Sequence, residues 1–429
     1  MLFMRDFPWK LLKLFIIVIF LMRTSSSYGY SSMTHLAIVD ANWDRVFIPM
    51  LKEKFPNATP EELLKAHAFA YGGSIAPDLG YQPGGSKLFS SLVHYVRSGD
   101  FVTNLLEEAS DINEYAFALG VLTHYYADIY GHEIAVNQSV PILFPKMKSK
   151  FGNIVTYADD KVTHQRVEFS FDVIQTGRGN YATKAYHDFI DFQFSKPVLE
   201  RAFFKTYGLD LNELFGNFSK TEGSFRWAVK EFIPQITRAA WRSNKKAIRD
   251  SLPRATKNSY IYRISKKEYY GEFGKEREKR SVRASIATFF IRISPKIGPL
   301  KSFKFKPSTK ATDKLFLQSF DASVLHIENG ARKIQANELS FENIDWDTGR
   351  KPREMEYHLA DKTYAQMLLK LKEKNFTTIT PALKENIFSF YQNYSPAVSS
   401  LDPALWQKTI AALEELKVKS PEPQTTTGK

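Results

Sequence analysis

The sequence predicts an all-α protein. Apolar residues recur with helical spacing from residue 33 to about residue 250, and typical helix-starting residues precede several of these stretches. Apolar segments with the same spacing return after about residue 312. The chain has 429 residues, of which 43% are hydrophobic and 14% aromatic, so it can bury a large core.

The first 29 residues are expected to be a signal peptide (1–29) and not part of the fold. A basic segment, "MLFMRDFPWKLLK", precedes the apolar run "LFIIVIFLM", which is too short to cross a bilayer as a stable helix. Ser27 and Gly29 fit the small-x-small rule, so cleavage after Gly29 would make Tyr30 the new N-terminus. The protein is therefore predicted to be exported, as a periplasmic or secreted protein. An uncleaved membrane anchor is the alternative.

Three segments in the first half of the chain carry helix-start signals. In "NATPEELLKAHAFAYGG", Thr59 is the expected N-cap, Pro60 takes the first helical position and Glu62 completes a capping box. The segment "DINEYAFALGVLTHYYADIY" starts with an Asp cap, and "DDKVTHQRVEFSFDVIQ" starts with acidic residues. A further long helix, "SFRWAVKEFIPQITRAAWRSNKKAIRD", is expected to be interrupted at Pro234.

From about residue 253 to residue 312 the chain is basic, aromatic and punctuated by Gly and Pro, and no element is assigned there. Helices are predicted again at "DKLFLQSFDASVLHIENGARKI", "EMEYHLADKTYAQMLLKLKEK" and "DPALWQKTIAALEELK". The tail "SPEPQTTTGK" is expected to be disordered.

The positive charge is concentrated in one segment. Between Arg238 and Lys310 there are 21 Lys or Arg against 5 Asp or Glu, a net of +16, so the rest of the chain carries −3 of the total of +13. We expect this segment to contact an anionic surface such as lipid headgroups or nucleic acid. A solvated basic face without a partner is the alternative.

The histidines point to a metal site. Six of the nine lie between residues 35 and 164, and two of these have a carboxylate four residues on: His124 with Asp128, and His164 with Glu168. On a helix such a pair projects from one face and can offer a nitrogen and an oxygen to the same ion. A single histidine in an apolar context is more often an ordinary core residue, but this grouping favours ligation. Because the chain has no cysteine, any metal must be held by His, Asp, Glu or backbone atoms, which suits zinc.

The order of these residues resembles that of the zinc-dependent phospholipase C family, whose fold the fungal single-strand-specific zinc nucleases share. The resemblance covers about residues 30–200 and is closest at "THLAIVD", "SIAPDLGY" and "HYYADIYGH". It implies a multi-helix fold with a zinc cluster in a cleft and a catalytic domain over residues 30–215. A mainly helical extension would follow over 216–415, and a tail over 416–429.

Carried over by position, the resemblance implies a set of metal ligands: Tyr30, His35, Asp78, His94, His124, Asp128, His132, His164 and Glu168. One zinc would lie with Asp78, His94, His124 and Asp128, a second with His132, His164 and Glu168, and a third with His35 and the backbone of Tyr30. Asp128 would bridge two of the ions, and Asp78 would also orient the attacking water as a catalytic residue. Tyr125, Tyr126 and Asn137 would either orient these ligands or pack as ordinary core residues.

Three features depart from the family pattern. The N-terminal aromatic residue is Tyr and not Trp, which matters little if its backbone atoms are the ligands. The stretch between His132 and His164 is long, and the extension beyond residue 215 has no counterpart in the small enzymes. These departures leave the choice of substrate open.

Three classes of function are compatible with the sequence. The first is a phospholipase C-like enzyme that cleaves lipid headgroup phosphodiesters with a zinc-activated water, and the second is a zinc-dependent nuclease acting on single-stranded nucleic acid. The third, a metal-stabilised binding protein, is disfavoured because a structural zinc site needs only four ligands. The closer resemblance and the export signal favour the phospholipase.

Asp345, Asp347 and Glu356 have only partial calcium-loop spacing, which Gly349 and Arg350 interrupt, so no calcium site is predicted.

Overall fold

The computed structural model of the protein describes residues 32–82, 84–178, 192–228 and 304–419, with a few isolated positions between 240 and 301. These residues form helices and connecting loops, and among them β structure is limited to isolated bridges such as Asp345 with Arg350. The all-α prediction is therefore confirmed. The predictions for the signal peptide, for Tyr30, for most of the basic segment 238–310 and for the tail from residue 420 fall outside the described residues.

Two tightly packed helices form the centre of the molecule, α4 (Pro60–Ile75) and α7 (Ile112–Tyr130). Their backbones approach closely because glycine replaces a side chain at the contact. A Cβ on Gly120 would lie 2.1 Å from the carbonyl oxygen of Ala70, and one on Gly73 would lie 2.0 Å from that of Phe117. Only glycine fits at such a contact. Nearly all of α7 is buried, which makes it the natural place for a site shielded from water.

The predicted helix starts are present. Thr59 caps α4 and forms the capping box with Glu62, and Asp111 caps α7 by accepting from the backbone amides of Asn113 and Glu114. The remaining elements before residue 228 pack on the central pair or on one another: α2 (Ser32–Asn42), η1 (Trp43–Phe47), α3 (Ile48–Lys54), η2 (Ala76–Tyr81), α5 (Lys87–Tyr95), α6 (Ser98–Glu108), η3 (Gly131–Val136), α8 (Asn137–Leu143), α9 (Pro145–Phe151), α10 (Lys161–Arg178), α12 (Lys196–Tyr207), α13 (Leu211–Leu214) and α14 (Phe218–Trp227).

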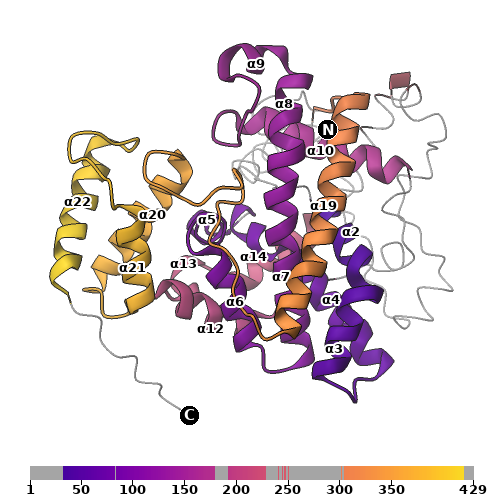
Figure 1. Cartoon of the computed structure of the whole chain (residues 1–429), viewed down its shortest axis with the longest axis horizontal. Coiled ribbons are helices and arrows are strands. Elements are labelled where there is room, and N and C mark those ends of the chain that lie inside the picture. Colours follow the sequence, from indigo (N-terminus) through magenta and orange to yellow (C-terminus); the bar gives the residue numbers. More distant parts are fainter. Residues whose placement is uncertain are drawn as a thin grey trace, which may run out of the picture.

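The C-terminal part of the chain divides into two groups of helices. Helix α19 (Lys310–Gln335) runs beside α7 and packs against it and η3, whereas α20 (His358–Glu373), α21 (Pro381–Phe390) and α22 (Pro403–Val418) gather at the left of Figure 1. Helix α20 packs against α5. The helices predicted in this region are thus present, and α19 belongs to the central core. None of the described helices combines the length and the apolar character that crossing a membrane requires.

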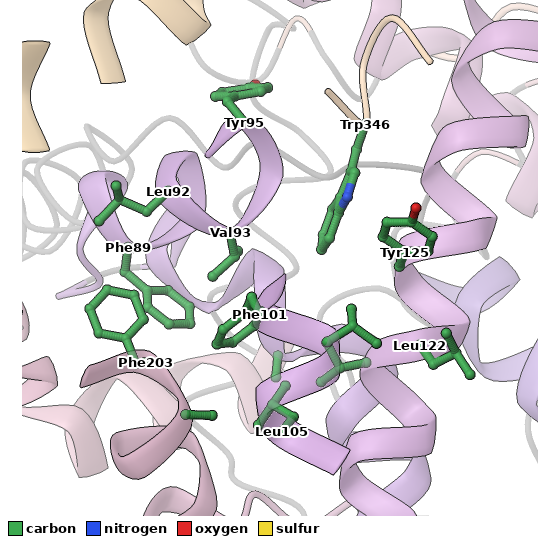
Figure 2. Packing of buried hydrophobic residues seen from close by; sticks show 14 of the residues in the cluster. Phe89, Leu92, Val93, Tyr95, Phe101, Leu105, Leu122, Tyr125, Phe203 and Trp346 are labelled. Carbon is green, nitrogen blue, oxygen red and sulfur yellow. The ribbon is translucent and has the colours of Figure 1, made fainter. Parts of the chain in front are cut away.

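One segment of the core comes from far along the sequence. Figure 2 shows Trp346 beside Tyr125, and the two ring centroids are 5.8 Å apart. Trp346 lies in the segment between α19 and α20 and is fully buried, with 0% of its surface exposed. The residues that follow α19 therefore return to the middle of the protein.

Candidate metal centre

Helix α7 places the first pair of candidate ligands. His124 and Asp128 are one helical turn apart and point to the same side, so His124 Nε2 lies 3.1 Å from Asp128 Oδ2. Both side chains are completely buried. The next residue of the pattern, His132, lies on the π-helical turn η3, and its Nε2 is 3.7 Å from Asp128 Oδ1. π-Helical turns are rare and frequently occur at functional sites.

Asp128 is the point at which four elements meet. His35 on α2 brings its Nε2 to 3.3 Å from Asp128 Oδ1, and His94 on α5 brings its Nε2 to 3.3 Å from Asp128 Oδ2. With His124 and His132, four imidazoles surround this one carboxylate. The structure thus brings together side chains from α2, α5, α7 and η3.

The other predicted residues complete the group. Asp78 on η2 has its Oδ1 3.7 Å from His94 Nε2 and is 1% exposed. On α10, His164 Nδ1 and Glu168 Oε1 are 2.7 Å apart, and the ring of His164 stacks on that of His132 with centroids 5.0 Å apart. Three sets of side chains have ligand atoms close enough to share an ion: His35, His124 and Asp128; Asp78, His94 and His124; His132, His164 and Glu168.

In three of the histidines, the ring nitrogen that faces away from the cluster also has a hydrogen-bond acceptor. These nitrogens lie 2.7 to 2.9 Å from an oxygen acceptor: His94 Nδ1 at the carbonyl of Ser90, His124 Nδ1 at the carbonyl of Ser74, and His164 Nε2 at Oδ1 of Asn137. An N–H facing an acceptor leaves the lone pair on the opposite nitrogen, which points inward. This arrangement is typical of metal-binding histidines.

For His35, His164 and Asp128, burial and neighbouring charges favour the protonation states that a metal needs. Burial and the nearby His132 hold the pKa of His164 well below its ordinary value, and burial and His124 lower the pKa of His35 to about 4. Both imidazoles are therefore neutral at pH 7 and can act as ligands. Burial opposes the charge of Asp128, but the imidazole of His124 and its neighbours lower its pKa well below the ordinary range.

The donor set fits a cation. Both nitrogens of His132 and both oxygens of Glu168 are buried, and no hydrogen bond from the described residues reaches them. Burial and the charges of Asp128 and Asp78 raise the pKa of Glu168 well above its ordinary value. Buried polar groups without partners are costly, and several carboxylates in one pocket repel each other unless a positive ion lies between them. Imidazole nitrogens and carboxylate oxygens are the ligands that zinc takes in the absence of thiolates.

Two residues near this centre were not anticipated from the sequence. The Trp346 ring lies 4.6 Å from that of His94, and Asp347 Oδ1 lies 3.9 Å from His132 Nδ1. The sequence drew attention to the acidic residues here only through their partial calcium-loop spacing. Of the residues considered for orienting ligands, Asn137 contacts His164, whereas the Tyr125 hydroxyl donates to the carbonyl of Glu342.

Comparison with known proteins agrees with this geometry. Residues 34–217 match the family model described as zinc dependent phospholipase C, and this range contains every candidate ligand except Tyr30. Neither the comparison with curated proteins nor that with solved structures yields a match. Over residues 34–217 the chain is therefore a member of the zinc-dependent phospholipase C family.

Proposed function

We propose that the protein is a zinc-dependent hydrolase that cleaves the headgroup phosphodiester of phospholipids. One observation carries the proposal: buried imidazoles from α2, α5, α7 and η3 meet at Asp128 within the segment that matches the phospholipase C family. A structural zinc site would need only four ligands with a closed shell. The larger donor set is what phosphodiester hydrolysis by clustered ions requires.

The proposed ligands divide among three zinc ions. They are Asp78, His94, His124 and Asp128 for one ion, His132, His164 and Glu168 for another, and His35 with the backbone of Tyr30 for a third that Asp128 shares. Bound zinc supplies Lewis-acid chemistry, which neutralises charge on the phosphoryl group and makes a water molecule nucleophilic at neutral pH. The exported location and the mature N-terminus at Tyr30 are part of this proposal.

Asp78 is proposed as the residue that orients the attacking water. Its carboxylate lies at the edge of the cluster, 3.7 Å from His94 Nε2, on the short 3₁₀ helix η2. A carboxylate in this position can accept a hydrogen bond from a water molecule and direct the oxygen lone pair toward phosphorus. Replacement by Asn would keep the shape but remove the charge that strengthens the hydrogen bond from the water.

Helix α9, which lies between the proposed ligands His132 and His164 in the sequence, supports a lipid substrate. Helix α9 has no buried residue and exposes Lys146, Lys148 and Lys150. Two flanking isoleucines are also exposed, Ile142 by 44% and Ile154 by 54%. Cationic side chains beside apolar ones suit the surface of an anionic membrane. We propose that α9 contacts the membrane there, in addition to the contact predicted for the segment 238–310.

The test combines metal analysis with an activity comparison. Elemental analysis of the mature protein should find about three zinc ions per chain, given this number of donors. Residues left ahead of Tyr30 should cost the third ion. Phosphatidylcholine vesicles should be hydrolysed with release of the phosphorylated headgroup, whereas single-stranded DNA should not be cut. A protein that retains one ion or fewer, or that cuts only DNA, would contradict the proposal.

A further inference from the structure

We infer that the segment around Trp346 and Asp347, outside the part of the chain that matches the family, positions two histidines of the metal centre. Asp347 would act on His132 directly and on His164 through Asn137. The inference rests on the proposed ligation of zinc by these histidines. Both residues would be positioning residues, since they act on the metal centre through other side chains.

The first contact is between Asp347 and His132. The two nitrogens of this imidazole face different carboxylates: Nε2 lies 3.7 Å from Asp128 Oδ1, and Nδ1 lies 3.9 Å from Asp347 Oδ1. The second distance is an electrostatic contact, longer than a hydrogen bond. A carboxylate on the outer side favours the tautomer with the proton on Nδ1, which leaves the Nε2 lone pair for an ion.

The carboxylate of Asp347 is itself held firmly. Its Oδ2 accepts hydrogen bonds from the hydroxyls of Tyr95 and Tyr357, both at 2.7 Å. Its backbone amide donates to Asp345 Oδ1 at 2.8 Å, so the turn also fixes the main chain. With its other oxygen bound in this way, Asp347 can present Oδ1 to His132 in one orientation only.

The second contact passes through Asn137. Its Nδ2 donates to the backbone carbonyl of Asp347 at 2.8 Å, and its Oδ1 lies 2.9 Å from His164 Nε2. A flipped amide would face acceptor to acceptor at Asp347 and would have no oxygen for the imidazole. The carbonyl of Asp347 therefore keeps the amide oxygen toward His164, which places the His164 proton on Nε2 and leaves Nδ1 beside Glu168, 2.7 Å from its Oε1.

Trp346 holds this turn against the centre. Its backbone amide donates to the carbonyl of His94 at 3.2 Å, and its ring lies 4.6 Å from the His94 ring and 5.3 Å from that of His124. The turn is closed by the bond from Gly349 N to Asp345 O at 2.8 Å. The indole ring and the turn together hold in place the outer partners of His132 and His164, which are Asp347 and Asn137.

The experiment measures zinc affinity in the full-length protein. Asp347→Asn and Asp347→Ala should bind zinc roughly 10- to 100-fold more weakly in competition with a chelator, because the outer partners of metal ligands typically contribute that much. Asp361→Asn is the matched control. Asp361 is a buried carboxylate of α20 that accepts from the Met355 amide at 3.0 Å and from the Ser400 hydroxyl. Its removal should lower the melting temperature of the metal-free protein and leave zinc affinity within about 2-fold of wild type.

Each outcome separates this inference from the proposed function. Wild-type zinc affinity in the Asp347 variants, with active wild-type enzyme, would overturn the inference alone. If the wild-type protein binds no zinc, the proposed function fails and the inference fails with it. Should neither Asp347 variant fold, Tyr357→Phe removes one hydrogen bond to the carboxylate and should weaken zinc binding a few-fold. Unchanged affinity in that variant would then refute the inference.

Discussion

Asp128 shows how one side chain can organise a whole site. Its carboxylate is fully buried in an otherwise apolar helix, yet imidazoles on four elements point their nitrogens at it. A buried charge of this kind persists only where positive charge compensates it. The zinc ions that we propose would provide that compensation, so loss of the metal is expected to cost stability as well as activity.

A second acidic residue, away from the centre, predicts a pH effect on stability. Burial and the neighbouring Asp361 raise the pKa of Glu354 to about 7. The unfolded chain releases this proton at a lower pH than the folded chain, so stability should fall as the pH rises from about 4.5 to about 7. Glu354→Gln should flatten this part of the melting-temperature profile, measured between pH 5 and pH 8 in excess zinc. Glu356→Gln, at an exposed neighbouring position, serves as the control, and equal slopes in all three proteins would contradict the assignment.

In the sequence, α8 and α9 lie between η3, which carries His132, and α10, which carries His164. No acidic residue occurs between residues 134 and 158, and α9 projects from the body at the top of Figure 1. Tyr157, just beyond α9, has its ring 5.6 Å from that of His164. The exposed basic helix α9 is thus followed directly by residues that line the metal centre. This position supports the proposal that α9 contacts the lipid surface.

Charge reversal on this helix should separate binding from chemistry. Lys146→Glu combined with Lys148→Glu should weaken sedimentation with anionic vesicles, most visibly at low salt, because each lysine near such a surface contributes about 1 kcal/mol. Hydrolysis of a small soluble phosphodiester should remain nearly unchanged. The matched control reverses Lys52 and Lys65, which are exposed on α3 and α4. Equal loss of vesicle binding in both double variants would show that net charge, and not α9, governs the interaction.

At the scale of the whole molecule, the family-like region and the C-terminal region share one core. Helix α19 packs against α7, where a Cβ on Gly330 would lie 2.9 Å from the ring of Tyr126. The start of α6 is equally close to the segment after α19, because a Cβ on Gly99 would lie 2.3 Å from the carbonyl oxygen of Phe341. Contacts of this closeness join the two regions.

Gly99→Ala tests that union. The added methyl group would meet backbone carbonyls that cannot move aside easily, so the free energy of unfolding should fall by about 1–3 kcal/mol. Denaturant unfolding measures the change. Gly216→Ala is the control, since nothing lies within 4 Å of a Cβ at that position, and it should be nearly neutral. If both variants lose the same free energy of unfolding, the contact between α6 and Phe341 does not contribute specifically to stability.

The parts of the site that were predictable are local in sequence. The i, i+4 pairs of His124 with Asp128 and His164 with Glu168 follow from helical geometry, and the helix starts at Thr59 and Asp111 follow from capping chemistry. The packing of Trp346 on His94 joins positions 252 residues apart (346 − 94), which no local pattern encodes. The π-helical turn that carries His132 was not predicted from the sequence either.

The contacts of Trp346 and Asp347 also bear on the order in which the chain assembles. The chain is synthesised from its N-terminus, so the helices that carry the five ligand histidines are made long before residue 346. Until that segment is made, His132 and Asn137 lack the contacts that Asp347 provides. Contacts so distant in sequence form late and slowly. We therefore expect newly made chains to pass through a period in which the metal centre is loosely ordered, and full metal retention to begin only once the turn at residues 345–350 has docked.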